Sequence, residues 1–437
     1  MFAEQVDRFF RFREHRTTLR QEVLAGRVTF VAIAYIIIVN PAILKSAGIP
    51  YEACMAATIL SAAFGCAVMG TYANRPFAIA TYVGENAFVA YTVVGVLHYP
   101  WQTALGAVFL SGLLLALLTL SGWRSVMSSA VPTSLKYSFA AGIGLFLAFI
   151  GFVNSGIVVV GSGSVPVAIG TLHHPAVILA IFGFILTGVL LVKKIPAAIL
   201  LGILATAGIA FVAGIAPAPA GIVSMPPSLA PTFLQLDLTG VFTWGMFSVV
   251  LTLFTMAFLD TMGTLIGLSA RAGFLDNEGN LPQVERPFLA DALATTAGAL
   301  LGTTTNDVFV ESAAGIEQGG RTGLVAIVCG ALFLIALFFA PLFSSIPLLA
   351  TGPALIVVGL MMIEPVSRLD FSDYAEVIPS FAVIAMMIFT YNIGVGLCAG
   401  FVLWPIFAIV HGRVREIPTA CWALFLLCLA FFVFSPY

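Results

Sequence analysis

The sequence predicts an all-α polytopic membrane protein with about 14 transmembrane segments, each of which needs about 20 apolar residues. Of its 437 residues, 60% are hydrophobic and only 9% are charged, and the mean hydropathy is +1.09. A soluble domain would carry about 25% charged residues on a polar surface. The apolar residues are also gathered into long runs. Lipid rather than water is therefore expected to surround most of this chain.

The apolar runs follow one another along nearly the whole chain. They lie at 24–44, 53–70, 77–95, 101–121, 134–153, 174–192, 195–213, 243–268, 287–302, 305–317, 321–342, 346–366, 376–392 and 393–411. A further apolar stretch at 417–436 is either an additional crossing or a helix in the membrane interface, because the preceding runs already return the chain to its starting side.

The basic residues predict the orientation of the chain, because Lys and Arg collect in cytoplasmic loops. With the N-terminus in the cytoplasm, all 18 Lys and Arg residues except Lys45 fall on the cytoplasmic side, including Arg124 after the fourth run. The N-terminal segment 1–23 is charged and lacks an apolar core ending in a cleavage site, so no removable signal peptide is expected. We predict a multi-pass protein of the cell (inner or plasma) membrane with a cytoplasmic N-terminus.

Composition and motifs argue against several other classes of protein. The net charge of -2 leaves no basic face for nucleic acid. All six cysteines fall in apolar runs without a CxxC pair or a His at ligand spacing, so no metal site is expected. The motifs His-Glu-x-x-His, Gly-x-Ser-x-Gly and Gly-x-x-x-x-Gly-Lys do not occur in the sequence. We therefore expect neither an enzyme nor a cofactor.

Short matches between the two halves of the chain indicate an internal repeat. The matched pairs are Pro132 with Pro347, Gly144 with Gly359, and Glu85-Asn86-Ala87 with Glu311-Ser312-Ala313. If each repeat holds seven spans, an odd number, the second half must be inserted upside down relative to the first. Inverted repeats of this kind are common among secondary transporters. Chance similarity between apolar segments is the alternative interpretation.

Carboxylates within the apolar runs are the first candidates for function. A charged side chain at the centre of a membrane helix costs about 2.5–3.5 kcal/mol on insertion scales, so such an acid predicts a functional role. The candidates are Glu85, Asp260, Asp307 and Glu311. Asp260 and Thr264 are four residues apart and share a helix face that can present both to a cavity. The alternative is an acid satisfied by neighbouring groups, with no ligand role.

Two stretches near these acids predict extended backbone. Segments 80–84 and 302–310 are rich in β-branched residues and glycine where a helix is expected to start. Non-helical chain at membrane depth is tolerated where it is buried in protein or lines a cavity. We predict extended segments in spans 3 and 10, followed by half-helices that begin near Asn86 and Ser312 and point unpaired N–H groups at a ligand. A Thr-rich loop outside the membrane is the alternative.

Several motifs resemble those of the AzgA-like hypoxanthine/guanine/adenine permeases, within the nucleobase–cation symporter (nucleobase–ascorbate transporter) superfamily. The similar segments are 27–30, 40–44, 259–265, 302–305, 311–316 and 319–324. Asp260 and Glu311 match the motif acids of that family, and Asn86 matches the Asn of its third span. Glu85 stands where the family has an apolar residue, and Asn306-Asp307 interrupts a hydroxyl-rich run. Glu85 is expected to face water reached from the cytoplasm, or to alter selectivity or coupling.

The resemblance implies seven-plus-seven inverted repeats divided between a core domain and a gate domain. The expected parts are the cytoplasmic segment 1–23, core segments 24–121 and 243–342, gate segments 134–213 and 346–411, and the extra C-terminal helix 417–436.

The resemblance also implies secondary active transport of purine nucleobases by proton symport, with elevator-like alternating access and the substrate between spans 3, 8 and 10. The expected substrate-binding residues are Asp260, Glu311, Asn86, Thr264, Ser312, Thr29, Phe309 and Glu85. Asp260 and Glu311 are expected to couple the proton as well. A homodimer in the lipid bilayer is compatible with the resemblance by analogy alone.

The chemistry of the acids agrees with a nucleobase. A carboxylate can accept two N–H groups from one edge of a guanine-like ring in charge-assisted hydrogen bonds. An aromatic face such as that of Phe309 can stack on the ring, although simple packing explains such a residue equally well. Uracil, xanthine or another nucleobase is an alternative substrate. An anion transporter of the same architecture is a further alternative, but Asp260 and Glu311 would repel a bare anion unless they were protonated.

Overall fold

The computed structural model describes residues 2–121, 131–161, 166–276 and 281–434, and most of them are helical. The helices of the first half are α1 Phe2–Phe10, α2 Leu19–Ile33, α3 Ile36–Lys45, α4 Tyr51–Val68, α5 Val83–Ala87, α6 Trp101–Ser121, α8 Thr133–Asn154, α9 Pro175–Val192 and α10 Ala198–Val212. Those of the second half are α11 Trp244–Ala272, α12 Glu285–Leu301, α13 Ser312–Glu317, α14 Leu324–Ala336, α15 Ala340–Ser344, α16 Leu348–Met361, α17 Tyr374–Phe389, α18 Ile393–Val410 and α19 Thr419–Phe434.

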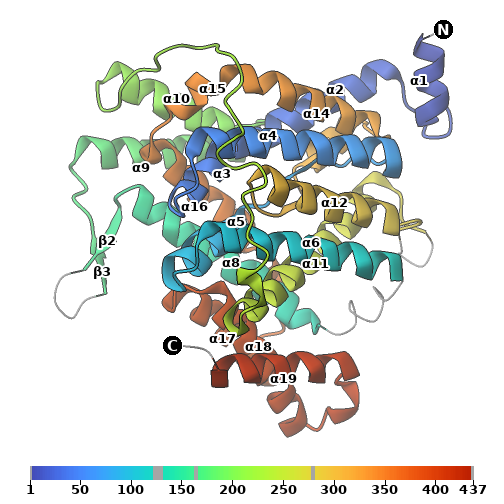
Figure 1. Cartoon of the computed structure of the whole chain (residues 1–437), viewed down its shortest axis with the longest axis vertical. Coiled ribbons are helices and arrows are strands. Elements are labelled where there is room, and N and C mark those ends of the chain that lie inside the picture. The colour runs from blue at the N-terminus through green and yellow to red at the C-terminus, as the bar shows by residue number, and fades with distance from the viewer. Residues whose placement is uncertain (1, 122–130, 162–165, 277–280, 435–437) are drawn as a thin grey trace.

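Most of the helices coincide with the apolar runs predicted from the sequence, but the run 305–317 contains only the short helix α13. Within the described residues, nine helices are long and apolar enough to cross a membrane, and four shorter apolar helices accompany them. Figure 1 shows α4, α6 and α12 running roughly parallel across the middle of the molecule, with α1 at one end of the long axis and α19 at the other. The chain is therefore a multi-pass membrane protein. Arg124, used above to predict orientation, lies outside the described residues.

Two short antiparallel strand pairs interrupt the helices. Strand β1, Ile79–Thr81, pairs with β4, Asn306–Val308, and all six residues of this pair are buried. Strand β4 lies within the predicted extended stretch 302–310, whereas β1 overlaps the predicted stretch 80–84 only at Ala80 and Thr81, because helix α5 already begins at Val83. Strands β2, Val158–Val160, and β3, Val167–Ile169, form a largely exposed hairpin between α8 and α9. The buried pair brings together segments more than 200 residues apart, so it can organise a site that neither half could form alone.

Glycines bring helices α8 and α16 into backbone contact. A Cβ added to Gly144 would lie 2.6 Å from the carbonyl oxygen of Gly359, and a Cβ on Gly359 would in turn collide with the carbonyl oxygen of Gly144. Such close approach is possible only without side chains at the crossing point. The two glycines that the sequence comparison matched between halves therefore meet in space.

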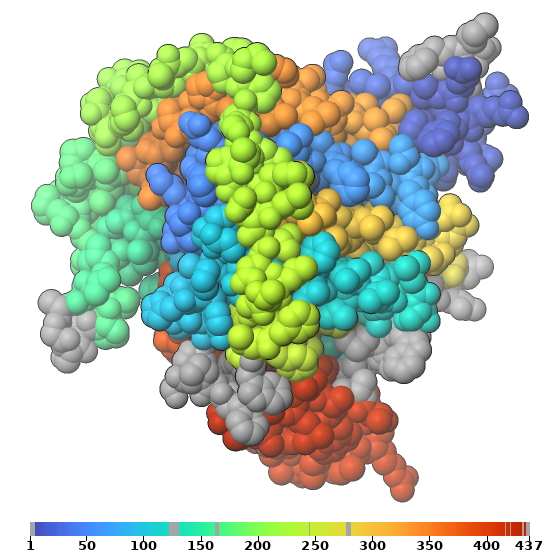
Figure 2. Space-filling model, in the orientation of Figure 1, coloured from blue at the N-terminus to red at the C-terminus, as the bar shows by residue number. Residues whose placement is uncertain are grey.

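A long connection between α10 and α11, residues 213–243, lies across several other elements. The Ser224 amide donates to the carbonyl of Phe338 at 2.9 Å, and the Leu234 amide to that of Leu300 at 2.8 Å. Asp237 donates its amide to the carbonyl of Gln102. Figure 2 shows this connection, in yellow-green, running down the visible face of the molecule.

Asp237 anchors the end of this connection. Its carboxylate accepts hydrogen bonds from the Thr239 hydroxyl at 2.7 Å, from the Gly240 amide at 3.2 Å and from the Thr103 hydroxyl of α6 at 3.2 Å. Hydrogen bonds from Thr239 and Gly240 lower the pKa of Asp237 below its ordinary value of 3.8.

The Asp237→Asn variant should lose less thermal stability than the native protein as the pH is lowered. A group whose pKa is lowered by folding contributes stability above its ordinary pKa, and that contribution is lost as the pH falls through the lowered pKa. The native protein should therefore lose thermal stability between pH values of about 5 and 3 more steeply than the variant. The measurement is the temperature of half-aggregation in detergent at each pH. Equal slopes would contradict the prediction.

Glu22 fastens α2 to the start of α14. Its side chain is fully buried and accepts four hydrogen bonds: from the Thr17 hydroxyl at 2.7 Å, the Arg321 amide at 2.9 Å, the Thr322 amide at 3.1 Å and the Thr322 hydroxyl at 2.7 Å. Both oxygens of the carboxylate are thus fully used. Glu22 therefore joins the chain before α14 to the N-terminal part of the protein, together with the hydrogen bond from Gln21 to the carbonyl of Gln318.

Glu22→Ala should destabilise the protein by about 3 kcal/mol or more, because it leaves several donors without acceptors and each such loss costs about 1–3 kcal/mol. The unfolding midpoint of purified protein in detergent measures the effect. Glu14→Ala is the matched control, since the Glu14 side chain is 66% exposed and makes only a surface ion pair with Arg11. Equal midpoints for the two variants would refute the assignment.

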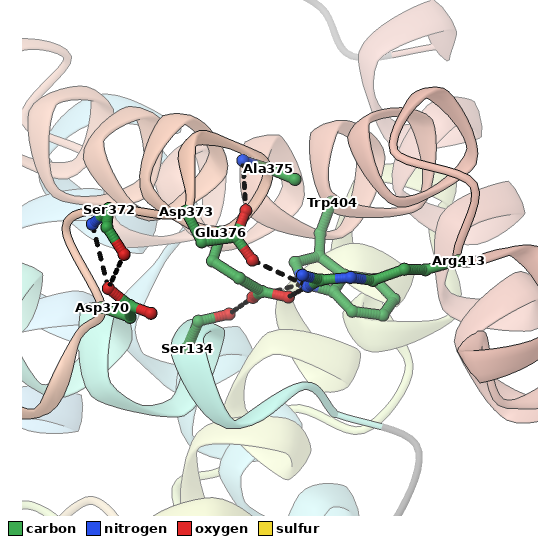
Figure 3. A network of polar contacts seen from close by, with 8 residues as sticks. All are labelled: Ser134, Asp370, Ser372, Asp373, Ala375, Glu376, Trp404 and Arg413. Atoms are coloured by element: carbon green, nitrogen blue, oxygen red, sulfur yellow. Dashed lines mark hydrogen bonds and ion pairs between the residues drawn. The ribbon is translucent and has the colours of Figure 1, made fainter.

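A second polar network joins α8, α17 and α18 (Figure 3). The guanidinium of Arg413 lies 2.8 Å from Asp373 and 3.5 Å from Glu376. Glu376 also accepts hydrogen bonds from the Trp404 indole, at 2.8 Å, and from the Ser134 hydroxyl. Asp373 caps the first turn of α17 through the Ala375 amide. This network fixes the ends of three helices to one another.

Candidate functional site

The buried strand pair frames the candidate site. The Tyr82 amide donates to the carbonyl of Thr305 at 3.1 Å, which extends the pairing of β1 with β4 by one residue. Helix α5 begins immediately afterwards, at Val83. The half-helix therefore starts three residues before Asn86, the start predicted from the sequence, because the extended segment ends at Thr81. The second half-helix, α13, begins at Ser312 as predicted.

Asn86 lies in α5 and is completely buried. Its side-chain oxygen accepts a hydrogen bond from the Thr304 hydroxyl, on the segment that leads into β4. Its side-chain nitrogen has no hydrogen-bond partner among the described residues. An amide buried in this way has two N–H donors available for a ligand acceptor.

Asp260 lies near the middle of α11 and is partly buried. Tyr82 lies close to it, and the Oδ2 atom of Asp260 has no hydrogen-bond partner among the described side chains and backbone groups. Glu85 lies close enough to Asp260 for their charges to interact. The structure thus brings together Asp260, Glu85 and Tyr82 beside Asn86.

Glu85 is fully buried, and neither of its carboxylate oxygens has a hydrogen-bond partner in the described part of the chain. The expectation that it faces water reached from the cytoplasm is wrong for this conformation. The reason is packing: all five residues of α5, Glu85 among them, are buried in the protein. A role of Glu85 in selectivity or coupling stays a prediction.

Glu311 lies at the position before α13 and is held by the α2–α3 junction. The Tyr35 hydroxyl donates to its Oε1 atom at 2.9 Å. The ring of Phe309 lies 6.4 Å from the ring of Tyr35 and is nearly buried. Ser312 uses its hydroxyl to accept a hydrogen bond from the Ala78 amide at 3.0 Å. Glu311 and Phe309 are therefore positioned by α2 and α3, and Ser312 by the chain before β1.

Two other predicted site residues, Thr29 and Thr264, make no hydrogen bond to the acids of the site among the described contacts. The Thr29 hydroxyl donates to the carbonyl of Ala25 at 3.0 Å, and Thr29 packs so closely on Gly315 that no Cβ would fit there. Thr264, one helical turn beyond Asp260, is partly exposed. In this conformation Thr29 makes a helix contact, and its role as a ligand residue stays a prediction.

The predicted N–H groups at the start of α13 are not free. The amides of Ser312, Ala313 and Ala314 donate to the carbonyls of Phe309, Val310 and Glu311, each at 3.0 Å. A tight turn before the helix satisfies these donors, so the expectation of unpaired amides is wrong for α13. Side chains rather than these backbone groups must therefore provide hydrogen bonds to a ligand at this end of the site.

Three polar residues near the site, Tyr82, Asp291 and Thr261, were not among the predicted site residues. Tyr82 is close to Asp260, Asp307 and Glu85. Asp291 of α12 and Thr261 of α11 are both completely buried and lie 2.7 Å apart. Asp291 falls within the run 287–302, so the rule that flagged the other intramembrane acids could have found it. Thr261 carried no comparable signal, because threonine is common in buried helices.

Asn306 and Asn40 hold the strand pair in place. Asn306 donates to the carbonyl of Ala294 at 2.8 Å and accepts from Ser61 at 3.2 Å. Asn40 donates to Thr58 at 2.7 Å and to Thr303 at 2.9 Å. These contacts attach β4 and the residues before it to α3, α4 and α12. Their role is positional.

The chain is similar in sequence to known proteins over most of its length. The sequence profile described as "Permease family" matches residues 20–396. The guanine/hypoxanthine permease PbuG of Bacillus subtilis (strain 168) is 39% identical over 437 residues, covering 98% of this chain and 99% of that protein. The adenine permease AdeP of Escherichia coli (strain K12) is 38% identical over 412 residues, covering 94% and 92%.

Among solved structures, the transmembrane domain of the cyanobacterial bicarbonate transporter BicA is similar in fold. The TM-score is 0.65 at 17% identity, and the match covers 87% of this chain and 97% of that domain. These comparisons confirm the resemblance that the motifs indicated.

Proposed function

This chain belongs to the permease family and is a membrane transporter rather than an enzyme, and we propose that it carries purine nucleobases by proton symport. Its relatives named as guanine/hypoxanthine and adenine permeases match it over nearly their whole length. Hypoxanthine, guanine and adenine are the proposed substrates. The proposed location is the cell (inner or plasma) membrane, with the N-terminus in the cytoplasm.

The proposed architecture has 14 spans in two inverted repeats of seven. The antiparallel pairing of β1 with β4 supports it, since matched segments of the two halves lie side by side. The contact between Gly144 and Gly359 supports it in the same way. The proposed core (24–121 and 243–342) moves relative to the proposed gate (134–213 and 346–411) in an elevator-like cycle.

The convergence of unpaired polar atoms beside the strand pair carries the substrate proposal. Asp260 offers a free carboxylate oxygen, and Asn86 offers a free side-chain nitrogen. A purine presents N–H donors on one edge and ring nitrogen or carbonyl acceptors, so it can satisfy both groups at once. A buried polar group without a hydrogen-bond partner costs free energy. A ligand that pairs with both Asp260 and Asn86 removes this cost, which favours its binding.

Asp260 and Glu311 are the proposed proton-coupling acids. Each is a carboxyl group at membrane depth and near the strand pair, and the Tyr35 hydroxyl holds Glu311 in place. Protonation would neutralise a charge that is expensive to move through a low-dielectric environment. A proton taken up with the nucleobase would therefore make the loaded site easier to carry across the membrane.

Uptake by purified protein in liposomes tests this function. Radiolabelled hypoxanthine, guanine or adenine should accumulate when an inward proton gradient is imposed, and a protonophore should abolish the accumulation. Empty liposomes are the control. Uptake no greater than theirs would refute nucleobase transport, while uptake that ignores the protonophore would refute symport and leave facilitated diffusion.

Transport of another solute is the alternative, and one competition assay separates the candidates. Uracil and xanthine share the planar ring and the donor and acceptor edges. The fold likeness to a bicarbonate transporter makes an anion the second candidate. The acids at the site disfavour a bare anion. Excess unlabelled purine should therefore compete with labelled hypoxanthine, whereas bicarbonate should not.

A further inference from the structure

Two buried carboxyl groups outside the proposed nucleobase contacts meet at a single hydroxyl. The Oγ1 atom of Thr261, on α11, lies 2.7 Å from Oδ2 of Asp291, on α12, and 3.1 Å from Oδ1 of Asp307, in β4. The same hydroxyl lies 2.7 Å from the carbonyl oxygen of Ala257, one turn earlier in α11. Three elements therefore converge on one oxygen atom.

The number of hydrogens at this junction is too small for two ionised acids. A threonine hydroxyl has one hydrogen to donate, and carboxylate and carbonyl oxygens can only accept. If both Asp291 and Asp307 were ionised, three acceptors would compete for that hydrogen, and of the carboxylate oxygens only Oδ1 of Asp307 has another donor among the described residues, the Val308 amide at 2.6 Å. A proton on one of the carboxyl groups lets that carboxyl donate to a lone pair of the Thr261 oxygen, so two acceptors instead of three compete for the hydroxyl hydrogen.

Burial strengthens this conclusion. Asp291 and Asp307 are 0% and 1% exposed, and Oδ1 of Asp291 and Oδ2 of Asp307 have no hydrogen-bond partner in the described residues. The second oxygen of each acid is thus left without a donor. Both carboxyl groups lie within hydrogen-bonding distance of the same Thr261 oxygen. Two ionised carboxylates placed so close together in a buried site would repel each other strongly, so we expect them to hold one proton between them.

The ionisable groups that face the pair are acids and a phenol. Asp260 interacts electrostatically with both Asp291 and Asp307. Glu85 and Tyr82 interact with Asp307. The other charged or titratable groups on the elements packed against α12 and β4 are Tyr51, Glu52, Cys54 and Cys66 of α4, Tyr72 after it, Arg271 in the last turn of α11, and Glu285 and Arg286 in the first turn of α12. Both arginines are exposed and are engaged elsewhere, Arg271 with Glu317 and Arg286 with the ring of Tyr72.

A metal ion is not suggested by the arrangement. Among the described residues, no group of three or more His, Cys, Asp or Glu side chains is placed to hold one. A proton is therefore the occupant that fits a pair of carboxyl groups bridged by a hydroxyl.

We propose that Asp291, Asp307 and Thr261 form a proton-binding site, in which the two carboxyl groups share one proton across the threonine hydroxyl. Its residues differ from the proton-coupling acids Asp260 and Glu311, although Asp260 lies close enough to interact electrostatically with both carboxyl groups. It fastens β4 to α11 and α12 when the proton is present. When the proton leaves, repulsion between Asp291 and Asp307 loosens β4, and with it the strand pair beside Asn86.

Infrared difference spectroscopy on the purified full-length protein in liposomes tests this site. The experiment uses no nucleobase, so its result is independent of the proposed function. Near neutral pH, the C=O stretching band of a protonated carboxylic acid in the unmodified protein should be lost in both Asp291→Asn and Asp307→Asn. When one of the two carboxyl groups is replaced by an amide, the remaining carboxyl group no longer has a charged neighbour in the pair and can ionise. Thr261→Val should shift that band, whereas Thr261→Ser should retain it.

Glu317→Gln is the matched control, because the Glu317 side chain is 69% exposed. Size-exclusion chromatography shows whether each variant is folded. If Asp291→Asn does not fold, the infrared spectra of Asp307→Thr and Thr261→Val test the shared proton instead. An unchanged protonated-acid spectrum in the Asp307 variants, or loss of the band in only one of the two aspartate variants, would overturn the shared proton. Loss of the band when sodium replaces choline at constant pH would also overturn it, since a metal cation would then be the occupant.

Discussion

Asp260→Asn is expected to reduce proton-driven nucleobase uptake by at least about 100-fold. The substitution removes an acceptor for charge-assisted hydrogen bonds worth about 1.5–3 kcal/mol each, and a factor of ten corresponds to about 1.4 kcal/mol. It also removes a carboxyl group that can take up the proton. Initial rates of labelled hypoxanthine uptake into liposomes, compared at equal protein content, measure the effect.

Two further variants should be measured in the same uptake assay. Glu311→Gln should also abolish accumulation, because the substituted amide can still accept from the Tyr35 hydroxyl but cannot exchange a proton. Glu317→Gln, at an exposed position six residues further along, should leave uptake unchanged. Uptake by the Asp260 variant within twofold of the unmodified protein would remove Asp260 from the site.

Gly144→Leu is expected to cost about 3 kcal/mol or more of stability, because the new side chain must enter a backbone contact that cannot yield easily. Its Cβ alone would lie 2.6 Å from the carbonyl oxygen of Gly359 and 2.8 Å from Cβ of Met362. Helices α8 and α16 would have to separate. The unfolding midpoint in detergent, read by the loss of the monodisperse peak on heating, measures the change.

Gly188→Leu is the control for this substitution. Gly188 lies within α9, and apart from its own helical turn no atom of the described structure comes within 4 Å of a Cβ added there. Replacing glycine by leucine in a helix is otherwise favourable, by about 1 kcal/mol. The control should therefore hold or raise the midpoint, and a comparable fall in both variants would refute the α8–α16 contact as the cause.

The apolar runs predicted the helices well because each run is a local property of the chain. The runs 101–121 and 134–153 correspond almost residue for residue to α6 and α8. The two extended segments were also predictable, since glycine and β-branched residues signal them locally. The start of α5 was misplaced by three residues because nothing in the sequence shows where pairing with β4 ends.

The acids show the limit of local reasoning. Asp260 and Glu311 were selected because a charge in an apolar run is costly, whatever its neighbours. The burial of Glu85 could not be read in the same way. Whether such a carboxyl faces water or protein depends on the packing of α5 against segments remote in sequence.

Consecutive residues were enough to show that this chain lies in a membrane, where its helices run and which family it resembles, because hydropathy and motifs are local properties. The folded chain was needed to show that Asp291, Asp307 and Thr261 share one hydrogen-bonding junction. It was needed equally to bring Gly144 against Gly359, and Tyr35 against Glu311. These contacts join residues as many as 276 positions apart, and such pairings depend on how helices pack rather than on local sequence preferences.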